Sequence, residues 1–426
     1  MIFGLSLIPI IFLTGMALDF TSAAQKRARL NAAADAAALA AVTPAMMIQS
    51  NSAALAAATN MFNAEAANIG AATVNPPTIT ISNAGLVRTV TVSYTATSTN
   101  TFPNVFSFVT GASHTTWPMS GSATSTSYSA PNINFYLLLD DSPSMNIAAT
   151  TAGINTMVAN TSAQGGCAFA CHESDPAADD LGNPKGEDNY TLAQNLGVVT
   201  RVENMATATS ALMTTAADTE QANNATYQMA IYTFDYNGLN TIYAPSNLPS
   251  SNLTAAATAA STINVLEVYS NNYLTKTNQN SDTDTNFETA MTAVNTLMPN
   301  PGTGSSNSTP QEVLFIVSDG VDDEVNSSSC SQPLDGTRCQ QPFNTAMCTT
   351  VKNRGIMIAV LYTEYLPLPT NSWYNTWISP FQSTLASNME NCASPGLYFE
   401  ITTDGDITAA MQTLFQLAIA TARLSQ

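Results

Sequence analysis

From residue 132 onward, the chain contains short runs of apolar residues, each of the length expected for a strand buried on both faces. These runs lie at residues 135–139, 227–234, 313–317, 356–362 and 397–401. Stretches that suit helices separate them, at residues 192–215, 287–297, 346–354 and 407–424. Strands that alternate with helices predict an α/β fold with a doubly wound, mostly parallel sheet. We place this domain at residues 131–426.

The start of the chain has a different pattern. Residues 1–18 carry no charged side chain and are just long enough to span a bilayer. A cleaved signal peptide is the alternative, but no basic segment precedes the apolar run and no A-x-A site closes it. The helical pattern instead continues into an alanine-rich stretch at residues 32–41. We therefore predict a retained transmembrane anchor at residues 1–20 and a stalk helix at residues 21–70.

Between the stalk and the α/β domain, polar residues alternate with apolar or β-branched ones. The alternation is clearest at residues 78–81 and 89–94, which we interpret as strands. Residues 122–130 are rich in threonine and serine, which is typical of a linker. We predict a small β-rich region and a linker at residues 71–130.

The apolar run at residues 135–139 ends in a cluster of side chains that carry oxygen. Asp140, Ser142 and Ser144 form the pattern D-x-S-x-S directly after it. Ligands of open α/β sheets bind at the carboxyl ends of the strands, and a carboxylate with two hydroxyls supplies the oxygen ligands that a small divalent cation takes. The alternative is an ordinary capped turn before the next helix. These residues alone do not separate the two interpretations.

Two later positions favour the cation. Thr285 opens an apparent helix, and Asp319 follows the apolar run at residues 313–317. D-x-S-x-S, a helix-opening threonine and a strand followed by Asp-Gly, in this order, resemble the von Willebrand factor type A domain. The resemblance implies a metal-ion-dependent adhesion site, at which Mg²⁺, or else Mn²⁺ or Ca²⁺, is held directly or through water by Asp140, Ser142, Ser144, Thr285 and Asp319. One position at the cation would stay open for an acidic group of a protein partner.

Other residues near these positions could modify the site. Pro143 stands where the family usually has glycine, which stiffens the loop without removing a ligand. Asp141, Asp282 and Asp284 could form an outer group of carboxylates, as could the acids at 322–324. The alternative for the acids at 282, 284 and 322–324, which we favour, is that they are solvated loop and helix-start residues.

The N-terminal segment, residues 4–42, resembles that of TadE/TadG-like Flp pilus-assembly proteins. The matching features are an apolar helix with an internal Pro9, then Ala-Leu-Asp-Phe, a basic patch and an alanine-rich run. The short basic segment that usually precedes the apolar run in this family is missing. Lys26, Arg27 and Arg29 by themselves favour the opposite orientation in a membrane. From the resemblance and the cysteines, we expect a single-pass protein of the bacterial inner membrane with most of the chain outside the cytoplasm.

Composition narrows the range of partners. The 426 residues include 11 Lys and Arg against 30 Asp and Glu, a formal charge of −19. Nucleic acids and anionic lipid headgroups need basic surfaces, so this balance argues against both as partners. The inner membrane would be contacted through the N-terminal helix alone.

The six cysteines are even in number and lie in predicted loops or late elements, which indicates an oxidising compartment. Cys167, Cys171 and His172 form C-x-x-x-C-H, one residue longer than the usual haem attachment motif, and we favour a short disulfide loop there. A bridge between Cys330 and Cys339 is geometrically easy, which would leave Cys348 and Cys392 to pair. Six cysteines allow many connectivities, and the sequence alone does not choose among them.

Together these features predict a TadG-like component of a Tad/Flp pilus-assembly system that binds a protein partner through a divalent cation. A general surface adhesin outside any pilus system is the alternative, and a haem or redox protein at Cys167 and Cys171 is a third. The chain has two histidines and no nucleophile–base arrangement with supporting context, so we do not expect an enzyme.

Overall fold

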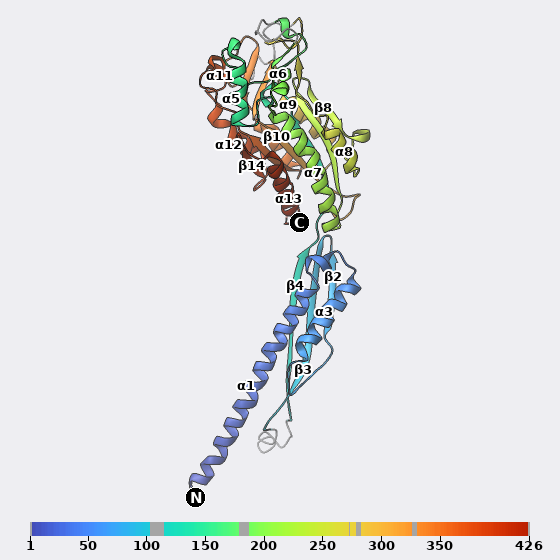
Figure 1. Ribbon diagram of the computed structural model, residues 1–426. Coiled ribbons are helices and arrows are strands. Elements are labelled where there is room, and N and C mark those ends of the chain that lie inside the picture. Colours follow the sequence, from blue (N-terminus) through green and yellow to red (C-terminus); the bar gives the residue numbers. More distant parts are fainter. Residues whose placement is uncertain are drawn as a thin grey trace. The chain divides into compact units, whose positions relative to one another are not determined.

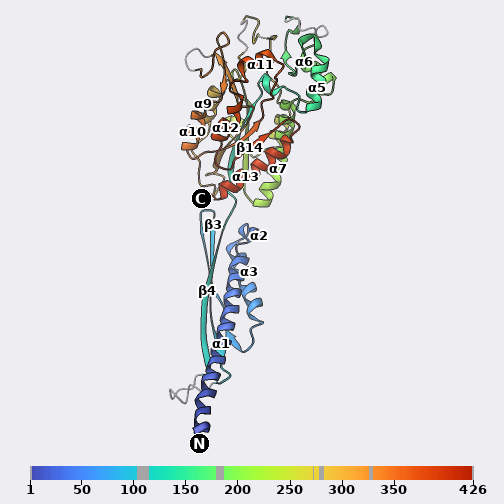
Figure 2. The same ribbon diagram turned by 90° about the vertical axis from the view of Figure 1, so that its left-hand side faces the viewer.

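The computed structural model describes residues 2–102, 115–178, 187–271, 273–277, 283–325 and 330–424. The chain divides into two compact units, Met1–Ser129 and Ala130–Gln426, which Figures 1 and 2 show from two sides. Each unit has its own hydrophobic core.

The first unit packs two helices on an antiparallel sheet. Its elements are α1 (Ile2–Ala40), α2 (Pro44–Met47), α3 (Asn51–Ala66), β1 (Ala72–Val74), β2 (Thr78–Ala84), β3 (Val87–Thr99) and β4 (Thr116–Tyr128). β3 pairs with each of the other three strands, and its buried side chains alternate with partly buried or exposed ones, as expected for a sheet with one face against helices. Buried alanines of α1 and α3, including Ala34 and Ala58, let the two helices pack closely.

Two predictions for this unit are wrong in detail. The stalk at residues 21–70 is not one helix, because α1 ends at Ala40, Pro44 opens the short α2, and α3 packs beside α1 (Figure 1). The stretch at 122–130 is mostly not a linker, because β4 extends to Tyr128. Its threonines face those of β3, and the hydroxyl oxygens of Thr91 and Thr124 are 2.9 Å apart.

The apolar beginning of α1 is exposed in this unit. Leu7, Ile10, Leu13 and Phe20 are each about half exposed or more. Asp19 is buried and accepts hydrogen bonds from the backbone N–H groups of residues 101 and 102 at 2.7 and 3.0 Å. Among the described residues, no helix combines the length and apolar character needed to cross a bilayer. The anchor at residues 1–20 stays a prediction.

The second unit is built on a six-stranded sheet. Its strand order is β14 (Tyr398–Ile401), β13 (Met357–Thr363), β10 (Gln311–Ser318), β5 (Ile133–Asp140), β7 (Tyr227–Asp235) and β8 (Gly238–Tyr243). The first five strands are parallel, and β8 is an antiparallel edge strand. Every residue of β5 and β10 is buried, as the continuous apolar runs predict.

Helices cover both faces of this sheet, so the predicted doubly wound arrangement is present. Phe135, Leu137 and Leu139 of β5 share a core with α7 (Arg201–Asn223), α8 (Leu253–Ala260) and α13 (Ile407–Leu424). Tyr136 and Leu138 point to the other face and share a core with α9 (Phe287–Leu297), α10 (Thr345–Asn353) and α12 (Gln382–Cys392). The alternation along β5 therefore supplies both cores.

Shorter elements gather near the carboxyl ends of the parallel strands or in the long connections. They are η1 (Pro143–Met145), α5 (Thr151–Asn160), η2 (Ser162–Gln164), β6 (His172–Glu173), η3 (Pro176–Ala178), α6 (Asn189–Asn195), η4 (Pro245–Asn247), β9 (Glu267–Val268), β11 (Val321–Val325), β12 (Arg338–Pro342) and α11 (Ser372–Trp377). The predicted helix at 192–215 is divided between α6 and α7. Gly197 adopts φ 68° after α6, and Thr200 with Glu203 forms a capping box that starts α7.

Two of the three predicted disulfides are present. Cys330 bonds to Cys339 and Cys348 bonds to Cys392, whereas Cys167 and Cys171 are not joined by a disulfide. The prediction of a Cys167–Cys171 bridge is therefore wrong for this structure. The segment between them pairs with Ile147 through a β-bridge at Phe169 and leads into β6.

The cysteine states can be measured directly. Alkylation of the oxidised full-length protein under denaturing conditions should label Cys167 and Cys171, and labelling after reduction should reach all six cysteines. Peptide mass spectrometry distinguishes the sites. Protein with no free thiol before reduction would show that the third bridge forms in solution.

Candidate metal centre

The turn after β5 brings three of the predicted ligands together. Asp140 is the last residue of β5 and is fully buried. Its Oδ1 accepts hydrogen bonds from the Ser142 backbone N–H at 3.1 Å and from the Ser142 hydroxyl at 2.6 Å. The hydroxyl oxygens of Ser142 and Ser144 are 3.1 Å apart. One tight turn therefore points these oxygen-bearing side chains toward one another.

The neighbouring strand β10 supplies a second carboxylate. Val317 is in register with Leu139, so the residues after them emerge together at the edge of the sheet. Ser318 donates a hydrogen bond to Asp140 Oδ2 at 2.5 Å. Asp319 follows, and its Oδ1 accepts from the Val321 N–H at 3.2 Å. Its Oδ2 is buried without a hydrogen-bond partner among the described residues, although such an atom normally has one.

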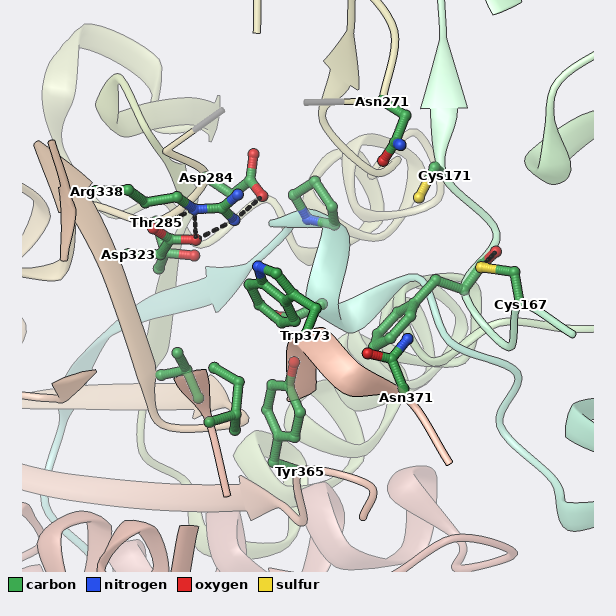
Figure 3. Close-up of a pocket in the computed structure, with 15 residues that line it drawn as sticks. Cys167, Cys171, Asn271, Asp284, Thr285, Asp323, Arg338, Tyr365, Asn371 and Trp373 are labelled. Carbon is green, nitrogen blue, oxygen red and sulfur yellow. Dashed lines mark hydrogen bonds and ion pairs between the residues drawn. The ribbon is translucent and has the colours of Figure 1, made fainter. Parts of the chain in front are cut away.

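Thr285 reaches the same region from a separate segment. It precedes α9, is 2% exposed, and exchanges two backbone hydrogen bonds with Asp323 of β11, at 3.0 and 2.9 Å. Thr285 and Ser144 line one pocket of about 350 Å³. Figure 3 shows Thr285 among the lining residues, close to Asp323. Ser144 also lines a small adjoining cavity together with Asp319. Asp140, Ser142, Ser144 and Asp319 therefore lie together where β5 and β10 end, and Thr285 is linked to them through the pocket that it lines with Ser144.

Burial and mutual repulsion act on the two carboxylates. Burial, followed by the charge of Asp319, raises the pKa of Asp140 well above its ordinary value, and its hydrogen bonds oppose this shift. Burial raises the pKa of Asp319 to about 6, while Ser144 and Arg201 act in the opposite direction. Two acids held this way destabilise the folded protein when both are ionised. A bound divalent cation would relieve that cost.

Two residues of this arrangement were not predicted from the sequence. Ser318 is one, although it directly precedes the strand-ending Asp319. Arg201 of α7 is the other, and its positive charge lowers the pKa of Asp319. The guanidinium donates to the Glu364 carbonyl at 2.6 Å and to the Thr403 hydroxyl at 3.2 Å. A lone arginine in a helical stretch gives no sequence signal of such a position.

The predicted outer acids have varied surroundings. Asp141 is buried beside Thr233, and burial raises its pKa to about 7. Asp284 forms an ion pair with Arg338 at 3.2 Å, and Asp282 lies outside the described residues. The expectation that the acids at 322–324 are solvated is wrong for two of them, because Asp322 is 3% and Asp323 is 5% exposed.

Asp322 and Asp323 are buried because each has a structural partner. Asp322 accepts a hydrogen bond from the Phe287 N–H at 3.0 Å, at the start of α9. Asp323 accepts two hydrogen bonds from Arg338 Nε, each at 2.9 Å. Asp322 therefore ties the β11–β12 hairpin to the start of α9, whereas Asp323 joins the two strands of the hairpin to each other.

The C-x-x-x-C-H segment lies beside the same pocket. Cys167 and Cys171 line it, and His172 Nδ1 is 2.9 Å from Asp188 Oδ2. The hydrogen bond to Asp188 raises the pKa of His172. Among the described residues, no three His, Cys, Asp or Glu side chains form a metal cluster. The candidate centre is instead composed of two carboxylates and three hydroxyls.

The pKa shifts predict how the stability of the metal-free protein, kept so by a chelator, depends on pH. Between the ordinary value of 3.8 and about 6, Asp319 binds more protons in the folded than in the unfolded state, so its contribution to stability falls as pH rises. Asp319→Asn should therefore gain stability relative to wild type across this window, by on the order of 1–3 kcal/mol at pH 8. Chemical unfolding from pH 4.5 to 8.5 measures the difference. A difference that does not change with pH would contradict the assignment.

Comparison with known proteins gives one family match and several similar structures. Residues 1–44 match the family model "Putative Flp pilus-assembly TadE/G-like". No curated protein matches the chain. Two structures of proximal thread matrix protein 1 from the mussel byssus match at 11% and 13% identity, both with a TM-score of 0.32; the second is described as having a zinc-occupied MIDAS motif. Each match covers 68% of this chain and about half of the mussel protein, 48% and 46%.

A third similar structure is the PilB minor pilin from Streptococcus sanguinis. It is 10% identical, with a TM-score of 0.33, and the match covers 83% of this chain and 78% of that chain. These structural similarities are weak, and the family match is limited to the N-terminus. The predicted family resemblance is confirmed there: the first 44 residues of this chain match the TadE/G-like pilus-assembly family model.

Proposed function

We propose that this protein is a non-enzymatic, pilus-associated component of a Tad/Flp system, and that its second unit is a type A domain that captures a protein partner through a divalent cation. The TadE/G-like segment supports the pilus association. The order of the ligand residues, and the edge of the sheet at which they meet, support the type A assignment.

One observation carries the cation proposal. Asp319 Oδ2 is buried with no hydrogen-bond partner among the described residues, beside a second buried carboxylate, Asp140. Carboxylate and hydroxyl oxygens are the ligands that Mg²⁺, Mn²⁺ and Ca²⁺ accept. Asp140, Ser142, Ser144, Thr285 and Asp319 would hold the ion. When bound, the ion would supply a positive charge, and a carboxylate of the partner would bind to it.

We further propose that the protein is associated with the bacterial inner membrane through its N-terminal segment, with the second unit outside the cytoplasm. The exposed apolar side chains at the start of α1 and the two disulfides support this location.

The cation proposal is tested by removing one charge. Asp140→Asn keeps the size of the side chain but removes one of the two negative charges of the candidate centre, so Mg²⁺ uptake by the full-length protein should be lost. Asp218→Asn, at an exposed position of α7, is the matched control and should bind like wild type. Isothermal titration with Mg²⁺ and Mn²⁺ measures both. Equal uptake by the two variants would place the ion elsewhere.

Thr285 provides a second test of the same centre. Because it comes from a separate segment and supplies a neutral hydroxyl, Thr285→Ala should weaken capture of the partner more than it weakens Mg²⁺ uptake. Pull-down from cells that assemble pili, with and without chelator, measures capture. Capture that is indifferent to both the substitution and the chelator would contradict a cation-mediated contact.

The location is tested with protease. Treatment of spheroplasts should degrade the second unit while the inner membrane is intact, and the protein should sediment with membranes. A second unit that resists protease until the membrane is broken would show that the orientation is opposite.

A further inference from the structure

The pocket that Ser144 and Thr285 line has an apolar side that the cation proposal does not use. Segments far apart in the sequence form it, and they include the turn after β5, the C-x-x-x-C-H segment, the β11–β12 hairpin and the chain around α11. Its apolar lining residues are Pro143, Phe169, Val321, Tyr365, Trp373 and Ile378. Its volume of about 350 Å³ lies at the lower end of the range for ligand pockets.

The apolar side chains of this pocket are firmly held. Tyr365 is 4% and Ile378 is 1% exposed, and burial raises the pKa of the Tyr365 hydroxyl well above its ordinary value. Trp373 is half-buried, and its ring packs 5.4 Å from the Arg338 guanidinium. Figure 3 shows Trp373 in the middle of the lining residues, with Tyr365 below it in this view. The pocket therefore has an aromatic wall, in which Trp373 is partly exposed to an occupant and Tyr365 lies almost buried behind it.

The charges of the pocket determine what can enter it. Arg338 is already paired with Asp323 and Asp284, so its charge is neutralised within the wall. Asp140 and Asp319 lie next to this wall, and Arg201 lines the small adjoining cavity with Asp319, so two acids outnumber one base there. A carboxylate would be repelled here unless a cation is bound, whereas an apolar group meets no such penalty.

We propose that this pocket receives a large apolar side chain, preferably aromatic, that neighbours the acidic group of the protein partner. The proposal rests on the cation site described above. Ser144 and Thr285 are shared between the candidate ligands and the pocket lining, so a carboxylate that reaches the ion brings its neighbouring groups against Trp373 and Tyr365. The ion selects for a negative charge, and the pocket selects for an apolar group beside it. The recognised element is then a short acidic–aromatic segment of a protein.

Small carboxylates test the two requirements separately. The probe is 3-phenylpropionate, and propionate, which lacks the ring, is its control; both are titrated into the full-length protein by ligand-observed NMR. With Mg²⁺ present, burial of the ring should make 3-phenylpropionate bind about tenfold more tightly than propionate. Chelator should weaken both acids. The neutral analogue 3-phenylpropanol should bind weakly and without dependence on Mg²⁺.

Two tryptophans of α11 supply matched variants. Trp373 lines the pocket and Trp377 does not, although both are half-buried on the same short helix. Trp373→Ala should bring the affinity ratio of 3-phenylpropionate to propionate close to one. Trp377→Ala should keep the wild-type ratio, which controls for general disturbance of the helix.

The outcomes separate this proposal from the cation site. If Mg²⁺ binds but the two acids bind equally, the pocket proposal is overturned and the cation site stands. If Mg²⁺ is not taken up, the cation proposal fails. In that case, binding of 3-phenylpropanol that is lost in Trp373→Ala would still support an apolar pocket. Absence of such binding would overturn the pocket proposal as well. An affinity ratio that Trp377→Ala lowers as much as Trp373→Ala does would also overturn it.

Discussion

The repulsion between two buried carboxylates is the constraint on which the second unit depends. Asp140 ends β5 and Asp319 directly follows β10; these strands are adjacent and parallel and their residues are all buried, so neither acid can move away without disturbing the centre of the sheet. Hydrogen bonds from Ser142 and Ser318 and the nearby charge of Arg201 offset the repulsion in part. Groups with strongly shifted pKa values in such positions are typical of functional sites, because a protein selected for stability alone has little reason to retain them.

The surroundings of this pair are fixed by contacts between distant segments. The Cys330–Cys339 disulfide constrains the hairpin beside Arg338, which is ion-paired with Asp323. The backbone of Asp323 in turn pairs with Thr285. The disulfide, the ion pair and the β-bridge therefore connect the hairpin continuously to Thr285. Tertiary contacts of this kind preorganise a site whose ligands come from three parts of the chain.

The sequence predicts the features that depend on local pattern. The buried strands follow from continuous apolar runs, and the candidate ligands follow from their positions at the strand ends. The split between α6 and α7 could also have been predicted from Gly197 and the T-x-x-E capping box at Thr200. β11 and β12 could not have been predicted, because their sequences, VDDEV and RCQQP, lack the alternation that is typical of a strand. Contacts between the two segments, which include the Arg338–Asp323 ion pair and the nearby disulfide, hold them together as a hairpin. Arg201 and Ser318 acquire their roles only when distant segments meet.

Location of the ion tests the central claim most directly. Crystals of the full-length protein grown with Mn²⁺ would give an anomalous difference signal at the bound ion. The account predicts one strong peak within coordination distance of Asp140, Asp319 or their bound waters, with Ser142, Ser144 and Thr285 around it. A peak only at other residues, or no peak at Mn²⁺ concentrations that saturate known oxygen-ligand sites, would show that the two buried carboxylates are not a metal centre.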